Sequence, residues 1–240
     1  MPLVAIRTIT GEEIESFSFA EHEWKEMKKA PLGTYSIYGF NWPAIPKTSI
    51  KGLQFFAAAP GCPIKTSQGE SHEHLSAKIA ITKAIRNLGL HAQPEFSGRT
   101  PEGDEWRADV YSENTSIPTA FEIQISPQTL DEYKSRSHKY NTSNVDCLWF
   151  VPEKKFITLT RAIFNDRFQR EGIKLYGHPF LPEVKVVTLL IINEEHRIEF
   201  FVRVFPEGKP CESIPLETFI EGYFQERLIL TENGWKWRTA

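Results

Sequence analysis

The chain has 240 residues, 40% of them apolar and 25% charged, which is the composition of an ordinary globular protein with a sizeable core. A net charge of −3, from 28 basic and 31 acidic residues, excludes a uniformly basic nucleic-acid-binding chain but not a local basic face. The three cysteines, Cys62, Cys147 and Cys211, form no C-x-x-C pair, so cysteine-based zinc spacing is absent and a reducing cytoplasm is expected. We read no signal peptide at the start and no apolar run of about 18 residues, so we expect no membrane contact.

The first sixty residues predict a β-rich segment. Leu3–Thr8 alternates apolar and polar residues and predicts a strand. Ser18 is expected to cap a short helix that runs through Lys29, with Glu21 completing a capping box. Two further short strands are predicted, at Tyr35–Tyr38 and Leu53–Ala57. Two prolines and a glycine between these strands predict an irregular stretch.

A strong helix is predicted over Glu70–Leu88, after a boundary marked by two prolines and a glycine. Gly89 ends this helix. Its inward stripe is expected to comprise Leu75, Ile79, Thr82, Ile85 and Arg86. Three strands, a second helix and a fourth strand follow: Ala92–Phe96, Trp106–Tyr111, Thr119–Ser126, Gln128–Asn141 and Cys147–Val151. This order favours an α/β (α+β) fold with a mixed central sheet flanked by helices.

The C-terminal third predicts an α+β extension. Val184–Ile192 and Arg197–Phe205 are β-rich runs around a hairpin at Asn193–His196. Ile214–Arg227 is expected to be helical, and Leu228–Trp237 to form a last strand or hairpin. These elements either extend the central sheet or form an accessory layer. Residues 154–174 contain six basic and two acidic residues, which indicates either a solvated helix face or a stripe that binds a nucleic-acid backbone.

Two strands carry acidic residues among apolar neighbours. Asp109 lies in the run Arg107–Val110, and Glu122 and Gln124 share one side of the strand Phe121–Ile125. A carboxylate among apolar residues is costly unless it is paired or binds a cation. Two of them on adjacent strands can share one hard divalent ion, which prefers oxygen ligands. Either acid alone would more simply pair with an arginine at a sheet edge.

Two helices add polar groups at helical spacing. Glu70, His74 and Lys78 lie at i, i+4 and i+8 and therefore share one face of the first helix. Arg136 and Tyr140 lie at i and i+4 of the second, where they either hold a phosphate or act as an exposed arginine and a half-buried tyrosine.

In this order and spacing, these residues resemble the competence protein CoiA-like family, whose nuclease domain belongs to the PD-(D/E)XK superfamily. The resemblance covers about residues 53–151. The matching pieces are Glu70-Ser71-x-x-His74-x-x-x-Lys78, Arg107-Ala108-Asp109-Val110, Phe121-Glu122-Ile123-Gln124-Ile125-Ser126, Arg136-x-x-x-Tyr140 and Trp149-Phe150. It implies a restriction-endonuclease-like core.

The resemblance also implies a metal site and its chemistry. Asp109 and Glu122 are expected to bind Mg²⁺ or Mn²⁺, with Glu70 and the Ile123 carbonyl as further ligands. Superfamily members usually have lysine two residues after the second acid, whereas this sequence has Gln124, as CoiA-like proteins do. We therefore expect Lys78 to supply the positive charge. His74 would organise the site or contact the substrate, together with Arg136 and Tyr140.

One departure concerns the segment before the core. Many relatives have a small Cys/His zinc module there, ending in Phe-Phe-Ala-His, whereas this chain reads Phe55-Phe56-Ala57-Ala58-Ala59. No structural zinc is therefore expected. The domains predicted are a β-rich segment over residues 1–60, a nuclease-like core over 61–155 and an extension over 156–240.

The function predicted from these features is Mg²⁺-dependent hydrolysis of DNA phosphodiester bonds, in DNA uptake and processing or in defence against foreign DNA. A catalytically weak, nuclease-fold DNA-binding module that aids competence or recombination is the alternative, and RNA or a nucleotide as substrate is a third possibility. DNA is the expected partner, and a homodimer is allowed for.

Overall fold

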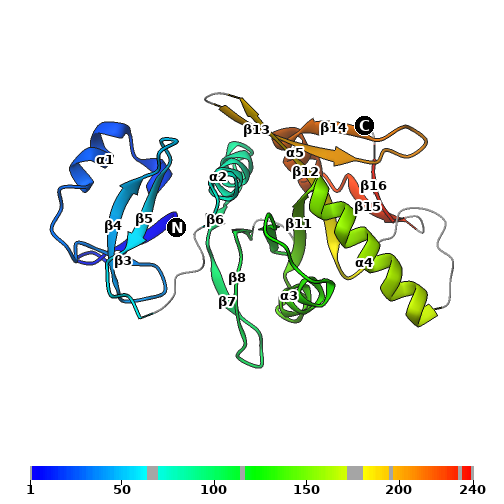
Figure 1. The fold of residues 1–240 in the computed structure, drawn as a ribbon, viewed down its shortest axis with the longest axis horizontal. Coiled ribbons are helices and arrows are strands. Elements are labelled where there is room, and N and C mark those ends of the chain that lie inside the picture. The colour runs from blue at the N-terminus through cyan, green and yellow to red at the C-terminus, as the bar shows by residue number, and fades with distance from the viewer. Residues whose placement is uncertain are drawn as a thin grey trace. The chain divides into compact units, whose positions relative to one another are not determined.

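The computed structural model describes residues 2–63, 70–113, 117–171, 181–194, 197–231 and 234–238. Contacts divide the chain into two compact units, Met1–Ile79 and Ala80–Ala240, and the division falls inside helix α2 (His72–Asn87) (Figure 1). The mixed α/β fold class predicted from the sequence is confirmed. Among the described residues, no helix has the length and apolar character that a membrane crossing requires.

The first unit contains an antiparallel sheet in the order β2-β1-β3-β4-β5. Its elements are β1 (Val4–Arg7), β2 (Glu12–Glu15), η1 (Ser16–Ser18), α1 (Glu21–Met27), β3 (Tyr35–Ile37), β4 (Pro43–Thr48) and β5 (Gln54–Ala58). Trp24 of α1 packs edge-on against Phe56 of β5, with ring centroids 5.2 Å apart. This contact lies in a core to which Ala5, Ile14 and Tyr35 also belong.

Two predictions for this unit are wrong. Ser18 does not cap α1: it lies in η1, and the helix begins at Glu21, where the Glu23 carboxylate accepts a hydrogen bond from the Ala20 N–H. The stretch predicted as irregular contains β4. The Phe56 N–H donates to the Pro2 carbonyl, away from β4, so the facing residue Pro46 sits at a non-hydrogen-bonded pair. Its missing N–H therefore breaks no bond to β5.

The second unit contains a mixed seven-stranded sheet in the order β14-β13-β12-β11-β10-β9-β6. Its strands are β6 (Gln93–Pro94), β9 (Val110–Ser112), β10 (Thr119–Ile123), β11 (Asp146–Pro152), β12 (Lys185–Glu194), β13 (Arg197–Val204) and β14 (Glu212–Pro215). The neighbours β10, β11 and β12 run parallel, and the other pairs are antiparallel. Two hairpins complete the unit: β7 (Ser97–Arg99) with β8 (Glu105–Arg107), and β15 (Leu228–Thr231) with β16 (Gly234–Trp237).

Helices cover both faces of this sheet, and its central strands are therefore buried on both sides. Cys147, Trp149 and Val151 of β11 share a core with residues of α3 (Leu130–Thr142) and α4 (Glu153–Glu171). The alternate residue Phe150 packs edge-on against Phe219 of α5 (Leu216–Phe224), at 5.8 Å between centroids. A strand buried on both faces reads as a continuous apolar run, as β11 does.

Several element boundaries differ from the sequence prediction. The run Trp106–Tyr111 is divided between β8 and β9, and the hairpin β7–β8 and the edge strand β14 were not predicted. The C-terminal strands β12, β13 and β14 extend the central sheet, whereas β15 and β16 form a separate hairpin. Of the predicted hairpin Asn193–His196, residues 195 and 196 lie outside the described part of the chain.

Candidate functional site

The centre of the candidate site is Glu122, whose side chain is only 1% exposed. Glu122 lies in β10 beside Trp149 of the parallel strand β11. Its neighbours Phe121 and Ile123 alternate to the other face of the strand, where Phe121 contacts Tyr223 and Phe224 of the C-terminal segment. The strand therefore places one carboxylate on the face that α3 covers.

Helix α3 presents four residues of one face toward β11: Tyr133, Arg136, Ser137 and Tyr140, at i, i+3, i+4 and i+7. The Arg136 guanidinium lies 4.7 Å from the centre of the Trp149 ring, and Tyr133 packs edge-on against the same ring. The Trp149 indole N–H donates to the Ser137 hydroxyl at 2.9 Å. These contacts fix the rotation of α3 about its axis relative to the strand.

The start of α3 is fixed by its own sequence. The Thr129 hydroxyl accepts a hydrogen bond from the Glu132 N–H, and the Glu132 carboxylate accepts one from the Thr129 N–H at 2.6 Å. This capping box satisfies two backbone donors that the first turn leaves without partners. It sets the register that brings Arg136 and Tyr140 to Glu122.

Both oxygens of Glu122 have protein partners. Arg136 Nη2 donates to Oε2 at 2.6 Å, and the Tyr140 hydroxyl forms a short hydrogen bond to Oε1. The same hydroxyl lies 3.0 Å from the Arg107 carbonyl oxygen. Arg136 also lies 3.4 Å from the Gln124 side-chain oxygen, so the guanidinium connects the two polar residues of β10.

The charge balance around Glu122 is set by burial. The pKa of Glu122 is raised to about 7: burial raises it most, the Arg136 charge lowers it, the negative charge of Asp109 raises it, and the hydrogen bonds from Tyr140 and Arg136 lower it. Burial and the adjacent Glu122 raise the pKa of Tyr140 well above its ordinary value, so Tyr140 is a neutral hydrogen-bond donor. A carboxyl group in this state can exchange its proton near neutral pH.

Asp109 lies between β8 and β9 and is fastened to β10. Its Oδ2 accepts a hydrogen bond from the Ile123 N–H at 2.9 Å, and its carbonyl accepts one from the Glu95 N–H, also at 2.9 Å. Glu95 has a φ of 59° and is buried, and its carboxylate is paired with Arg107 at 2.8 Å. Asp109 is thus bound to the residue that follows Glu122, which explains why its charge affects the Glu122 pKa.

Glu70, His74 and Lys78, which the sequence predicted to share one helix face, belong to the first unit. Lys78 is 3% exposed and its amine lies 2.5 Å from Glu70 Oε1, while His74 Nδ1 lies 3.6 Å from the same oxygen. Glu70 lies two residues before α2 begins, so the prediction that it shares a helix face with His74 and Lys78 is wrong, but its carboxylate contacts both of these side chains.

Glu70 and His74 in the first unit and Asp109 in the second each offer one atom of a kind that binds metal ions. Carboxylate oxygens suit hard divalent ions, and an imidazole is compatible with Mn²⁺. Gln124 donates its side-chain amide to the Ser126 carbonyl at 3.0 Å. Gln124 therefore contacts the loop after β10 through its nitrogen and Arg136 through its oxygen.

Sequence reasoning selected Glu122, Arg136 and Tyr140 but not the bonds among them. It missed Ser137, Glu95 and the role of Trp149 as the surface under Arg136. Ser137 lies four residues after Tyr133, so the helical spacing carried this signal. Glu95 had no local signal, because its left-handed backbone and its pairing with Arg107 depend on the hairpin between them.

This mixed sheet, with helices on both faces and a buried acid near its centre, is consistent with a nuclease-like core. Residues 70–180 match the family model described as competence protein CoiA, nuclease-like domain. This match confirms the resemblance to the CoiA-like family drawn from the motifs of the segment. No curated protein matches the chain.

Proposed function

We propose that the protein is a metal-dependent nuclease that hydrolyses DNA phosphodiester bonds, in DNA uptake and processing or in defence against foreign DNA. One observation carries the proposal: the carboxylate of Asp109, just before β9, accepts a hydrogen bond from the N–H of Ile123, the residue after Glu122 on β10, within a nuclease-like domain. A buried acid whose pKa is raised further by a second, half-buried acid is costly in a purely structural role.

The donor set fits Mg²⁺ or Mn²⁺. Asp109 and Glu122 would hold the ion with oxygen ligands, and Glu70 and the Ile123 carbonyl would add further oxygens. Arg136 and Tyr140 each use one lone pair of Glu122, and a carboxylate has about four, so capacity remains. A bound divalent ion would lower the pKa of a water and offset charge on the phosphate.

The other side chains would position substrate and protons. Lys78, held by Glu70, would place a positive charge near the phosphate oxygens, in the role that a strand lysine has in most of the superfamily. Gln124 would orient the water or the phosphate through its amide. His74 would organise Glu70 or move a proton, and Arg136 and Tyr140 would keep Glu122 in place.

The test is a cleavage assay with labelled single-stranded DNA, duplex DNA, RNA and nucleotides, each with Mg²⁺ or Mn²⁺. Asp109→Asn and Glu122→Gln should abolish cleavage while the circular dichroism spectrum stays that of the wild type. Asp104→Asn, an exposed acid of the β7–β8 hairpin, is the matched control and should cut normally. Normal cleavage by either site variant contradicts the assignment.

A second candidate is a catalytically weak DNA-binding module that aids competence or recombination. It is favoured by Gln124 in place of the superfamily lysine and by the engagement of both Glu122 oxygens by Arg136 and Tyr140. Calorimetric titration with Mn²⁺ separates the two. Binding that Asp109→Asn removes supports the nuclease, and DNA binding without any Asp109-dependent metal binding supports the module.

A further inference from the structure

Helix α4 has two apolar stripes, only one of which is buried. Leu159 and Ile163 face the sheet and belong to its core. On the opposite side of the helix, Ile157, Phe164 and Phe168 are 46%, 37% and 47% exposed. At i, i+7 and i+11 these three side chains lie on one line along the helix. Single exposed apolar residues are ordinary, but an aligned set on one helix is a mark of a binding surface.

The two phenylalanines of this outward stripe hold their rings parallel to each other. The rings of Phe164 and Phe168 are nearly parallel, at 6° between planes, with centroids 6.4 Å apart. Parallel rings at i and i+4 present π-faces on which another planar group can stack. An aliphatic partner would not require this geometry.

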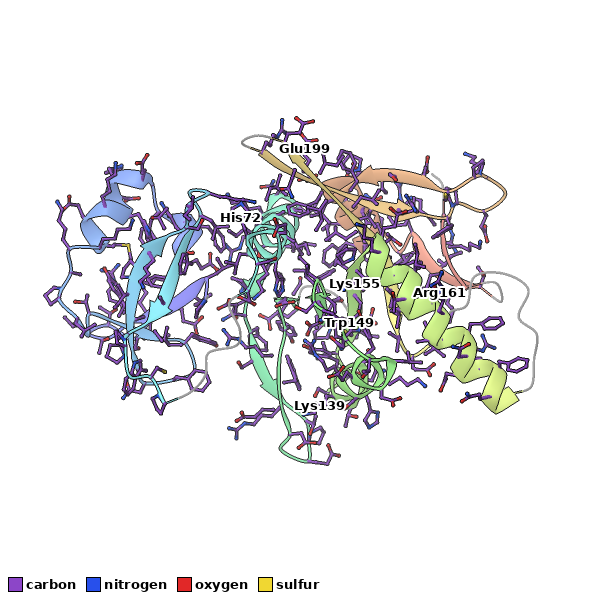
Figure 2. All side chains as sticks on the ribbon, in the orientation of Figure 1. His72, Lys139, Trp149, Lys155, Arg161 and Glu199 are labelled. Atoms are coloured by element: carbon purple, nitrogen blue, oxygen red, sulfur yellow. The ribbon has the colours of Figure 1, made fainter. Side chains whose placement is uncertain are left out.

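Basic residues occupy the remaining positions of the same stripe. Lys154 and Arg161 lie three residues before and four residues after Ile157, so basic and apolar side chains alternate along the outward line. Figure 2 shows Arg161 along α4, and also Lys155, the residue that follows Lys154. Spacings of three and four residues keep all five side chains on one side of the helix.

The acids of α4 do not neutralise this stripe. Glu153 is paired with Arg203 of β13, and Asp166 is paired with Lys134 of α3 at 3.0 Å. Both acids thus serve to attach α4 to neighbouring elements. Between Lys154 and Phe168 the outward line offers positive charge and aromatic faces and no acid, and the third acid of α4, Glu171, follows Phe168 at the end of the helix.

We propose that the outward stripe of α4, formed by Lys154, Ile157, Arg161, Phe164 and Phe168, binds single-stranded nucleic acid. The inference deepens the proposed nuclease function, on which it rests, by assigning the surface that holds the substrate strand. Phosphates would contact Lys154 and Arg161, and unpaired bases would stack on Phe164 and Phe168. Duplex bases are already stacked on each other, so the surface distinguishes single strands from duplex.

A second copy of the chain fits this stripe less well. Pairing two α4 helices about a two-fold axis would bring Arg161, at the centre of the stripe, against Arg161 of the other copy, where like charges repel. Three partly exposed apolar side chains also fall short of the roughly 800 Å² per partner that a standard interface buries. Charge complementarity therefore favours a polyanion.

The test measures binding of the full chain to a labelled 20-nucleotide single strand and to its duplex, by fluorescence anisotropy in EDTA so that no cleavage occurs. Phe164→Ala/Phe168→Ala should weaken single-strand binding by about tenfold or more. Phe164→Trp/Phe168→Trp should retain it, because indole rings also stack. Lys154→Gln/Arg161→Gln should lower the slope of log K against log salt by about 1.4 for a single strand.

Matched controls separate a local effect from a general one. Ile192→Ala/Leu230→Ala removes two equally exposed apolar side chains on other elements and should leave binding unchanged. Parallel titrations with RNA of the same sequence show whether the surface separates the two nucleic acids. Sedimentation equilibrium of each variant reports the oligomeric state.

Three outcomes overturn the inference: single-strand binding unaffected by the alanine pair, equal binding of duplex and single strand in every variant, or a dimer that the alanine pair dissociates. Because binding is measured without metal, an α4-dependent affinity with no cleavage in Mg²⁺ refutes the nuclease proposal alone. Cleavage that continues while the α4 variants bind like wild type refutes this inference alone.

Discussion

Replacing Arg136 by methionine tests whether the ion pair at the centre of the site stabilises the fold. Methionine keeps an unbranched side chain over Trp149 but removes the charge that faces Glu122. Removing one partner of a buried ion pair costs about 3–5 kcal/mol, because the other charge stays buried without compensation. Arg136 is itself 39% exposed, and water screens exposed charges, so we expect a loss near the low end, about 3 kcal/mol.

This loss should depend on pH with a definite sign. The folded-state pKa of Glu122, about 7, lies above that of an unfolded glutamate, so stability falls as pH rises through this window. Without Arg136 the folded pKa rises further, and the fall continues to higher pH. The Arg136→Met penalty should therefore grow by about 1 kcal/mol between pH 7 and 8, since one pH unit is worth at most about 1.4 kcal/mol.

The assay is urea unfolding in EDTA, monitored by fluorescence and circular dichroism. In a Glu122→Gln background the same Arg136→Met change should cost much less, which gives a coupling of about 2 kcal/mol. Arg99→Met, which removes a fully surface-exposed pair with Glu105, should cost less than about 1 kcal/mol. Equal penalties for Arg136→Met in both backgrounds would refute the role of this pair.

Two further changes test the packing that supports the site. Gly222→Ala in α5 should destabilise the protein by about 1–3 kcal/mol, because the added Cβ would lie 2.5 Å from the buried Trp237 ring. This loss is expected despite the higher helix propensity of alanine. A higher denaturation midpoint would contradict this packing. Ser137→Ala should cost about 1–3 kcal/mol in the same urea assay, because it leaves the buried Trp149 indole N–H without its acceptor. An unchanged midpoint would mean that this hydrogen bond contributes nothing.

Elements defined by their own periodicity could be predicted from the sequence. The helix α2 carries an apolar stripe and ends at Asn87, two residues before Gly89, which has a φ of 76°, and α3 is preceded by a threonine with a glutamate three residues further on. Both signals are local, so both helices were expected within a few residues of their observed bounds. The strand β11 was recognisable as a continuous apolar run, which is the pattern of a strand buried on both faces.

Features that depend on distant pairing could not be predicted. Pro46 is compatible with a strand only because the Phe56 N–H points away from it and donates to the carbonyl of Pro2, which is distant in sequence. The hairpin β7–β8 interrupts the expected strand before Asp109, and no periodicity marks this break. The same limit applies to the site, where spacing indicated a shared face for Arg136 and Tyr140 but not that both would bond Glu122.

The placement of Arg136 offers a reason for glutamine at position 124. The guanidinium lies between the Glu122 carboxylate and the Gln124 side-chain oxygen, so the region beside this strand already holds one positive charge. A lysine at 124 would bring a second cation against Arg136 in a half-buried position, where like charges repel strongly. A neutral amide instead accepts from Arg136. Positive charge thus comes to β10 from a helix rather than from the strand, and a glutamine is compatible with a working acidic site.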